Sequence, residues 1–492
     1  MDQFKSHKQI LKSTGIVGGA QISAIIIGIV RTKIIAILLG PAGIGIIGIL
    51  QATIDLARSA TGFGINFSGV KDVAEASASG DSQKIARTII IIRRWALGTG
   101  LLGMILTIAL CIPLSKYAFG NDSYALSIAI ISVTLFITSI SSSQIALLQG
   151  LRQIGEMAKA TLLGAIFGTA ITLPLYWWLG ISGIVPGMIL TAIGSLIVSW
   201  WFGRKIKIEK QNLSLTQILK GGWNMARLGF FIVITGFVAT ATLYLVRAFV
   251  ATKMNIDAVG YFQASWMIAN MYLGIVLNAM LADFFPRLSE INLDNKASNK
   301  LINEQLQMAL LVGSPMVISL TACAGIVITA LYSASFSMAI PVLQWQMGGS
   351  FLVLIMWPMG VMFLAKNKGL FCIITDALWS IVYFVIIYFG WDYWGFNILG
   401  IAYVAACIVK LISVIISTKY LGDFLFSKIN IRYITIFGAA TLVTLLNALY
   451  VTNNLQYITG SILIISSIYY SYSQLSKIID IKMIIFTKIL KR

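Results

Sequence analysis

Four basic residues lie inside apolar stretches that are long enough to cross a lipid bilayer. Arg31 and Lys33 lie in the stretch from Leu11 to Gly45, Arg58 lies in the next stretch, and Arg247 lies in one farther along the chain. About 20 apolar residues span the hydrocarbon core, and a cation at its centre costs about 2.5 kcal/mol or more. Each cation must therefore face protein, water or a bound anion. A cation that pairs with a neighbouring helix only for packing is the alternative to a cavity-lining one.

The balance of charge indicates what such a cavity would bind. Asp55 is the obvious counter-ion near these cations. Excess positive charge in a medium of low dielectric constant is costly unless an anion shares it. A guanidinium group matches phosphate oxygens in a bidentate manner, so a phosphate or pyrophosphate headgroup is the simplest candidate. We therefore predict a substrate-binding set made of Arg31, Lys33, Arg58 and Arg247.

Two pairs of opposite charges are candidates for ion coupling or gating. Asp55 precedes Arg58 by three residues, and Asp283 precedes Arg287 by four. Both spacings place the two side chains on one face of a helix, where an ion pair with only a structural role is the alternative. Glutamines within apolar stretches, such as Gln144, also have a functional and a structural interpretation. They either line a hydrophilic cleft or join helices by hydrogen bonds.

The remaining reactive residues do not form a catalytic or metal site. The four cysteines lie in apolar runs without metal-ligand spacing, and the single histidine, His7, lies in the polar N-terminal segment. Free cysteines in such positions behave as small core residues. We predict no catalytic residue, no metal and no cofactor.

The composition predicts an all-α integral membrane protein. Hydrophobic residues make up 58% of the chain, charged residues make up 11%, and the mean hydropathy is +0.89. We predict about 14 transmembrane helices, at about 11–40, 43–70, 88–113, 125–150, 158–179, 183–202, 228–250, 259–285, 302–331, 339–365, 370–389, 396–417, 433–451 and 457–472. The residues between the second and third spans, 71–87, are predicted to form a polar loop.

The chain divides into two halves that resemble each other weakly. A shift of about 215 residues brings Ile44 and Gly45 onto Val259 and Gly260, and it brings Arg31 next to Arg247. We predict a six-helix bundle at 1–205, a second one at 206–427, two additional spans at 428–475 and a basic amphipathic cytoplasmic tail at 476–492. Repeats of this kind place a binding site at their interface, near the bilayer midplane.

The distribution of charge predicts the orientation. With the N-terminus inside, the outer connections contain only Lys116 and Lys253 as cations, and the inner ones hold the basic runs. This arrangement follows the positive-inside rule and places both termini in the cytoplasm. Trp and Tyr clusters, such as the one that begins at Tyr176, are interpreted as interfacial belts.

Several motifs resemble those of a known family. TKIIAILLGPAGIG at 32–45, GFGINFSGVKDVAEA at 62–76 and LLQGLRQIG at 147–155, together with the basic link between the halves, resemble the Wzx-type flippases of bacterial surface-polysaccharide synthesis. These belong to the multidrug/oligosaccharidyl-lipid/polysaccharide (MOP) exporter superfamily, and the similarity covers roughly residues 8–420. Lys33 is the cation whose position best matches the family's motif.

The resemblance implies a carrier in the bacterial inner membrane. Its cargo would be an undecaprenyl-pyrophosphate-linked oligosaccharide, such as an O-antigen repeat unit for lipopolysaccharide, moved from the cytoplasmic to the periplasmic leaflet by alternating access. Its partners would be that lipid, the bilayer and, in the assembly pathway, a polysaccharide polymerase and a chain-length regulator; nucleic acid is not expected. The alternatives are an exporter of drugs or other small molecules and a membrane enzyme that acts on lipid-linked sugars. Short outer connections count against the enzyme.

Overall fold

The computed structural model describes residues 2–206, 211–451 and 454–478, and within these ranges it is helical with no β-strand. The predicted class, an all-α membrane protein, is therefore confirmed. The predicted basic tail at 476–492 lies, from residue 479 onward, outside the described residues.

Two compact units make up the chain. The first comprises Met1–Gly260 and Leu331–Ser333, and the second comprises Tyr261–Ala330 and Ala334–Arg492. The division falls inside helix α10 (Ile256–Glu290). The predicted boundaries at residues 205, 427 and 475 stay predictions.

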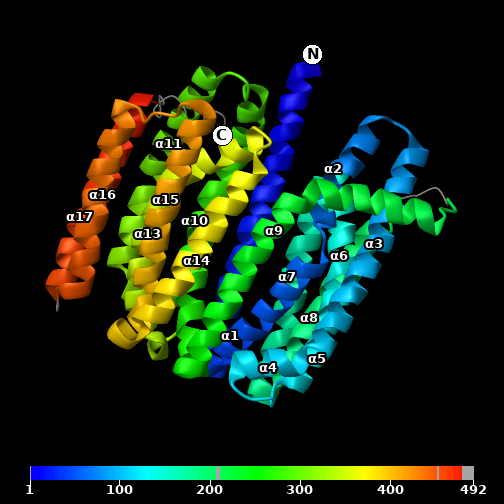
Figure 1. Cartoon of the computed structure of the whole chain (residues 1–492), viewed down its shortest axis with the longest axis horizontal. Coiled ribbons are helices and arrows are strands. Elements are labelled where there is room, and N and C mark those ends of the chain that lie inside the picture. Colours follow the sequence, from blue (N-terminus) through cyan, green and yellow to red (C-terminus); the bar gives the residue numbers. More distant parts are fainter. Residues whose placement is uncertain (1, 207–210, 452–453, 479–492) are drawn as a thin grey trace. The chain divides into compact units, whose positions relative to one another are not determined.

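The first unit contains long helices that run along one another and shorter ones at their ends (Figure 1). It contains α1 (Asp2–Thr61), α2 (Ile65–Ala78), α3 (Ser82–Ala109), α4 (Cys111–Phe119), α5 (Ala125–Ile131), α6 (Val133–Gly150), α7 (Ile154–Leu179), the 3-10 turn η1 (Gly180–Gly183), α8 (Ile184–Gly203), α9 (Leu215–Lys253) and the first residues of α10.

The second unit is also a bundle, in which α13 packs against both α11 and α15. It contains the rest of α10, α11 (Asn295–Ala322), α12 (Ala324–Leu331), η2 (Ala334–Phe336), α13 (Ala339–Ala365), α14 (Gly369–Trp394), η3 (Gly395–Asn397), α15 (Ile398–Gly422), α16 (Lys428–Tyr450) and α17 (Asn454–Ile478). Helices α16 and α17 correspond to the last two predicted spans, and both pack against α11.

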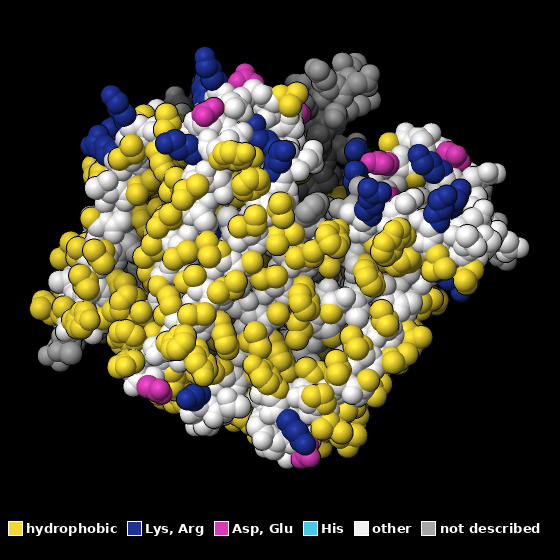
Figure 2. Space-filling view, in the orientation of Figure 1, with side chains coloured by type: hydrophobic (Ala, Val, Ile, Leu, Met, Phe, Trp, Pro, Cys, Tyr) yellow, Lys and Arg dark blue, Asp and Glu magenta, His cyan; other side chains and the backbone are white. Residues whose placement is uncertain are grey.

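Length and hydropathy make most of these helices able to cross a membrane. Among the described residues there are 10 such stretches, and three of them, of 39, 50 and 54 residues, each hold two of the predicted spans. In each unit the visible face is mainly hydrophobic along the helices, and the charged side chains gather near the helix ends (Figure 2). This pattern is typical of a multi-pass membrane protein.

Several predicted connections differ from the structure. The predicted polar loop at 71–87 is helical except for a short turn, because α2 continues to Ala78 and α3 begins at Ser82. Asp81 caps α3 by accepting hydrogen bonds from the backbone N–H groups of Gln83 and Lys84, at 2.9 and 3.1 Å. A capped start satisfies backbone donors that are otherwise unpaired, so a polar segment can be helical.

Four predicted spans are interrupted. The second ends at Thr61, three residues before Gly64, whose left-handed φ of 67° precedes α2. The third breaks at Leu110, the fourth at Ser132 and the ninth at Cys323. Hydropathy does not register such breaks, because residues on both sides of each break are apolar.

The break between the first two spans depends on one glycine. Gly40 has φ 63° and ψ −168°, outside the helical region, and Pro41 follows it. This region of backbone space is almost exclusive to glycine. Proline lacks the N–H that would continue the helix, so Gly40 and Pro41 together bend α1 there.

Substitution of Gly40 by alanine tests this interpretation. No atom lies within 4 Å of the position that a Cβ would occupy, so any cost comes from the backbone alone. We expect Gly40→Ala to lower the free energy of unfolding by about 1–3 kcal/mol. Thermal unfolding of the detergent-solubilised protein measures this loss. Gly28→Ala, also in open space but without a positive φ, is the control and should unfold like the unsubstituted protein.

Candidate functional site

Arg31 lies on α1 beside α7, where it has a specific partner. Its guanidinium group interacts with the phenol of Tyr176. Gly168 of α7 leaves room for it, because a Cβ there would lie 3.4 Å from Nη1 of Arg31. Gly187 of α8 does the same for Tyr176, since a Cβ would lie 2.8 Å from its ring. Two glycines therefore let the Arg31–Tyr176 pair fit between helices.

Tyr176 is a residue whose role the sequence reasoning missed. It was interpreted as part of an interfacial belt with the two tryptophans that follow. Tyr176 is only 2% exposed, whereas Trp177 and Trp178 are 72% and 79% exposed. The two tryptophans agree with the belt interpretation, and Tyr176 points inward. In an apolar helix such as α7, no alternation of polar residues marks which side is buried.

We expect Tyr176→Phe to destabilise the protein. The substitution removes the hydroxyl group that interacts with a charged group and leaves a half-buried guanidinium with one polar partner fewer. Such interactions contribute about 1.5–3 kcal/mol, so the loss should be about 2 kcal/mol of unfolding free energy. Thermal unfolding in detergent measures it. Tyr393→Phe, at a tyrosine that is 83% exposed, is the control; equal unfolding of the two variants would contradict the role assigned to Tyr176.

Asp55 and Arg58 form an ion pair on α1. Arg58 donates through Nη2 to Oδ1 of Asp55, and Gln51 donates to the same oxygen at 3.2 Å. The adjacent Ser59 shares a hydrogen bond of 2.7 Å with Thr240 of α9. The pair is partly exposed and stays accessible to a ligand. The structure thus joins a predicted binding residue to a predicted coupling residue.

Arg247 is the most buried of the predicted cations. It lies on α9 and is 7% exposed. Its interactions include a hydrogen bond of 3.3 Å from Nη1 to the carbonyl oxygen of Leu243, one turn earlier. Lys33 is half-buried on α1 and also has an interaction partner. The partners of the three arginines therefore include different groups: a phenol for Arg31, a carboxylate for Arg58 and a backbone carbonyl for Arg247.

In the second unit, the predicted gating pair lies on the surface of α10. Arg287 donates to Asp283 at 3.1 Å, and the two side chains are 57% and 77% exposed. Exposed pairs of this type contribute little to stability. Asp376 of α14 and Lys410 of α15 form a less exposed ion pair, which joins these two neighbouring helices.

Gln144 is a polar residue within a span that joins two helices. Gln144 of α6 is buried and accepts a hydrogen bond of 3.0 Å from Nη2 of Arg93 of α3. Gly203 makes room for it, because a Cβ would lie 2.5 Å from Oε1 of Gln144. Of the two interpretations of Gln144, the structure supports the hydrogen-bonding one. Among the described residues, no group of three or more His, Cys, Asp or Glu side chains could hold a metal ion.

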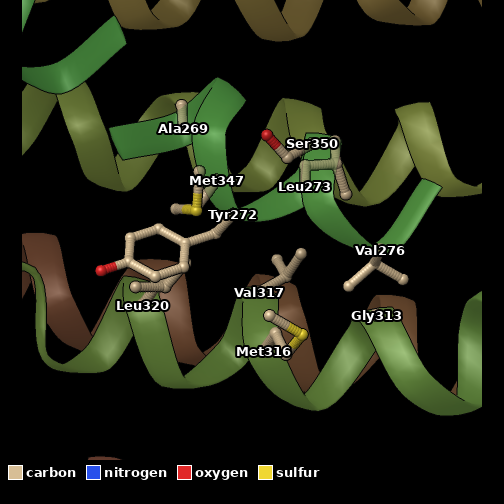
Figure 3. Close-up of a pocket in the computed structure, with 10 residues that line it drawn as sticks. All are labelled: Ala269, Tyr272, Leu273, Val276, Gly313, Met316, Val317, Leu320, Met347 and Ser350. Atoms are coloured by element: carbon tan, nitrogen blue, oxygen red, sulfur yellow. The ribbon is translucent and has the colours of Figure 1, made fainter. Parts of the chain in front are cut away.

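Two cavities differ in their chemistry. The one drawn in Figure 3 lies in the second unit, where Tyr272 of α10, Met316 of α11 and Met347 of α13 are among the lining residues and Met347 lies beside the ring of Tyr272. Its volume is about 10 Å³, which is room for at most one water molecule. The other, in the first unit, has a volume of about 740 Å³ and includes Arg94 among its lining residues. Of these two cavities, only the one in the first unit is large enough for an organic ligand.

Comparisons with known proteins agree with this architecture. The family described as polysaccharide biosynthesis protein matches residues 34–341, which is more than half of the chain. The lipid III flippases of Escherichia coli (strain K12) and Shigella flexneri are each 22% identical over 356 residues, which cover 71% of this chain and 84% of theirs.

Solved structures of transporters have a similar fold. The lipid II flippase MurJ in an inward closed conformation superposes with a TM-score of 0.68 at 15% identity, over 94% of this chain and 98% of that one. An inward-facing multidrug resistance MATE family transporter of the MOP superfamily superposes with a TM-score of 0.62 at 14% identity, over 84% and 95%. The predicted resemblance is confirmed: the chain belongs to the polysaccharide biosynthesis protein family and has the fold of the MurJ flippase and of a MATE transporter of the MOP superfamily.

Proposed function

We propose that the protein is a flippase for lipid-linked oligosaccharides in the bacterial inner membrane, with both termini in the cytoplasm. The observation that carries the proposal is the presence of Arg31 and Arg247 within apolar helices of a chain whose relatives are named flippases. Cations held at membrane depth match the pyrophosphate that joins such a sugar to its lipid. The names of the relatives indicate the class of cargo, and the two cations explain how its pyrophosphate group could be bound.

The finer substrate is an undecaprenyl-pyrophosphate-linked repeat unit of a surface polysaccharide such as O-antigen. The pyrophosphate would enter from the inner leaflet, the sugars would occupy a hydrated cavity, and the polyprenyl chain would stay in lipid. Outward movement of negative charge is favoured by about 2.3 kcal/mol per charge for every 100 mV of membrane potential. A polymerase and a chain-length regulator are the proposed partners that use the delivered unit.

The proposal predicts protein-dependent translocation in liposomes. The protein is reconstituted with an undecaprenyl-pyrophosphate oligosaccharide that carries a fluorescent sugar, and a quencher outside reports how fast the label crosses. Acceleration over protein-free liposomes supports a flippase. An unchanged rate for every glycan tested, with and without proton or sodium gradients, contradicts it, and a chemically altered lipid would indicate an enzyme instead.

A further inference from the structure

The cavity of about 740 Å³ in the first unit lies between α3, the residues before α9 and the first turns of α9. Arg94, Trp95 and Gly98 of α3 line it from one side, and Gln211, Asn212 and Leu219 line it from the other. A volume of this size falls within the range of about 300–1,000 Å³ that is typical of small-molecule sites.

The walls of this cavity are amphipathic. Leu102, Leu213 and Ile218 contribute apolar surface, and Arg94, Gln211 and Asn212 contribute polar groups. Arg94 is exposed, and among the residues that the structure describes no carboxylate pairs with it. One cation beside apolar walls complements a ligand with one anionic group and one hydrocarbon part.

Specific contacts hold α3 and the first turns of α9 together at one side of the cavity. Nε1 of Trp95 donates a hydrogen bond of 2.8 Å to the carbonyl oxygen of Ile218, and the edge of its ring meets Phe63. Gly222 allows this contact, because a Cβ there would lie 1.8 Å from Nε1 of Trp95. Met225 is buried in a core cluster with residues of α2, α3 and α6. The first turns of α9 are therefore fixed against α3.

The same turns present an exposed apolar stripe, of which Leu215 and Leu219 also line the cavity. Leu215, Leu219 and Trp223 are spaced four residues apart on one face of α9 and are all exposed. In Figure 1 this first part of α9 runs across α2 and the first half of α3 before the helix turns to run along its neighbours. A helix with an exposed apolar stripe that runs across a membrane span suits the boundary between headgroups and acyl chains.

We propose that this cavity is a binding site for an anionic phospholipid of the surrounding bilayer. The phosphodiester group contacts Arg94, and the first part of an acyl chain lies between α3 and the first turns of α9. Arg94 lies 12 residues into α3, so its side chain reaches the headgroup level by extending along the helix. The site is separate from the proposed translocation of lipid-linked sugars and does not depend on it.

Photolabelling tests the proposal without any measurement of transport. The full chain is reconstituted in vesicles that contain phosphatidylglycerol or phosphatidylcholine with a diazirine in the acyl chain. After irradiation, labelled peptides are identified by mass spectrometry. We expect phosphatidylglycerol to label peptides from 90–102 and 211–219 more than phosphatidylcholine does. Arg94→Gln should lower this labelling about fivefold, the value for one basic side chain at an anionic surface.

Two further variants keep the test specific. Arg87→Gln, at an exposed arginine two turns earlier on α3, should leave the labelling unchanged. Gly98→Leu should lower labelling by both lipids, because nothing lies within 4 Å of a Cβ at Gly98 and the side chain would fill the cavity. Equal labelling by the two lipids, no effect of Arg94→Gln, or displacement by inorganic phosphate would each overturn the proposal; the last result would indicate a site for a soluble anion.

Discussion

Replacing Gly260 by alanine is expected to destabilise the first unit severely. A Cβ at Gly260 would lie 2.0 Å from the carbonyl oxygen of Pro41 and 2.7 Å from its carbonyl carbon. These are backbone atoms, so no rotamer change removes the clash, and α1 and α10 must move apart. Overpacking of this kind costs about 1–3 kcal/mol and occasionally more, and we expect the upper part of that range.

Thermal unfolding in detergent, followed by size-exclusion chromatography with fluorescence detection, measures the effect. Gly236→Ala is the matched control, because nothing lies within 4 Å of a Cβ there and alanine favours helix more than glycine does. The control should unfold at the same temperature as the unsubstituted protein or slightly above it. A Gly260→Ala variant with the stability of the control would contradict the close approach of the two helices.

The sequence already indicated a relation at this contact. The weak internal repeat aligns Gly45 with Gly260, and in the structure these two glycines meet: a Cβ at Gly45 would lie 3.0 Å from the backbone nitrogen of Gly260 and 2.2 Å from the carbonyl oxygen of Ile256. The repeat predicts that these two residues are equivalent in the two halves of the sequence. It did not show that they touch, because equivalence in a repeat carries no information about crossing points.

Membrane helices were predictable because length and hydropathy alone identify them. The breaks within them were not, since the breaks at Leu110 and Cys323 lie in continuous apolar sequence. The side chains that contact the cations were equally unpredictable from the sequence. Tyr176 and Trp177 are adjacent aromatic residues, and only the packing of α7 against α1 and α8 shows that one is buried with Arg31 and the other is exposed.

The cavity beside Arg94 could not be predicted from the sequence, for a different reason. The arginine and the apolar residues of α9 are more than 100 positions apart, and they share a cavity because α9 starts at Leu215 and crosses the first half of α3. The sequence placed the seventh span at about residue 228, so the earlier turns of α9 were taken as part of a basic linker. Hydropathy averages conceal a short amphipathic start of this kind because its polar and apolar faces cancel.

Charge reversal at Arg31 and Arg247 is expected to abolish translocation of lipid-linked oligosaccharide. Both cations lie within membrane-length helices, and Arg247 is 7% exposed. If they attract a pyrophosphate group, a carboxylate at each position would repel it instead. The double variant Arg31→Glu, Arg247→Glu should therefore show the rate of protein-free liposomes in the quenching assay.

A milder pair of variants separates binding from folding. Arg31→Gln and Arg247→Gln remove charge without adding a buried carboxylate, and each should slow translocation at least about tenfold, which is about 1.4 kcal/mol of lost interaction with the headgroup. Arg87→Gln, at an exposed arginine near the start of α3, is the control and should retain full activity. Thermal unfolding of every variant identifies any that fail to fold. Full activity in well-folded Arg31→Gln and Arg247→Gln would show that these cations serve packing alone, because a headgroup site cannot lose its charge without losing affinity for an anion.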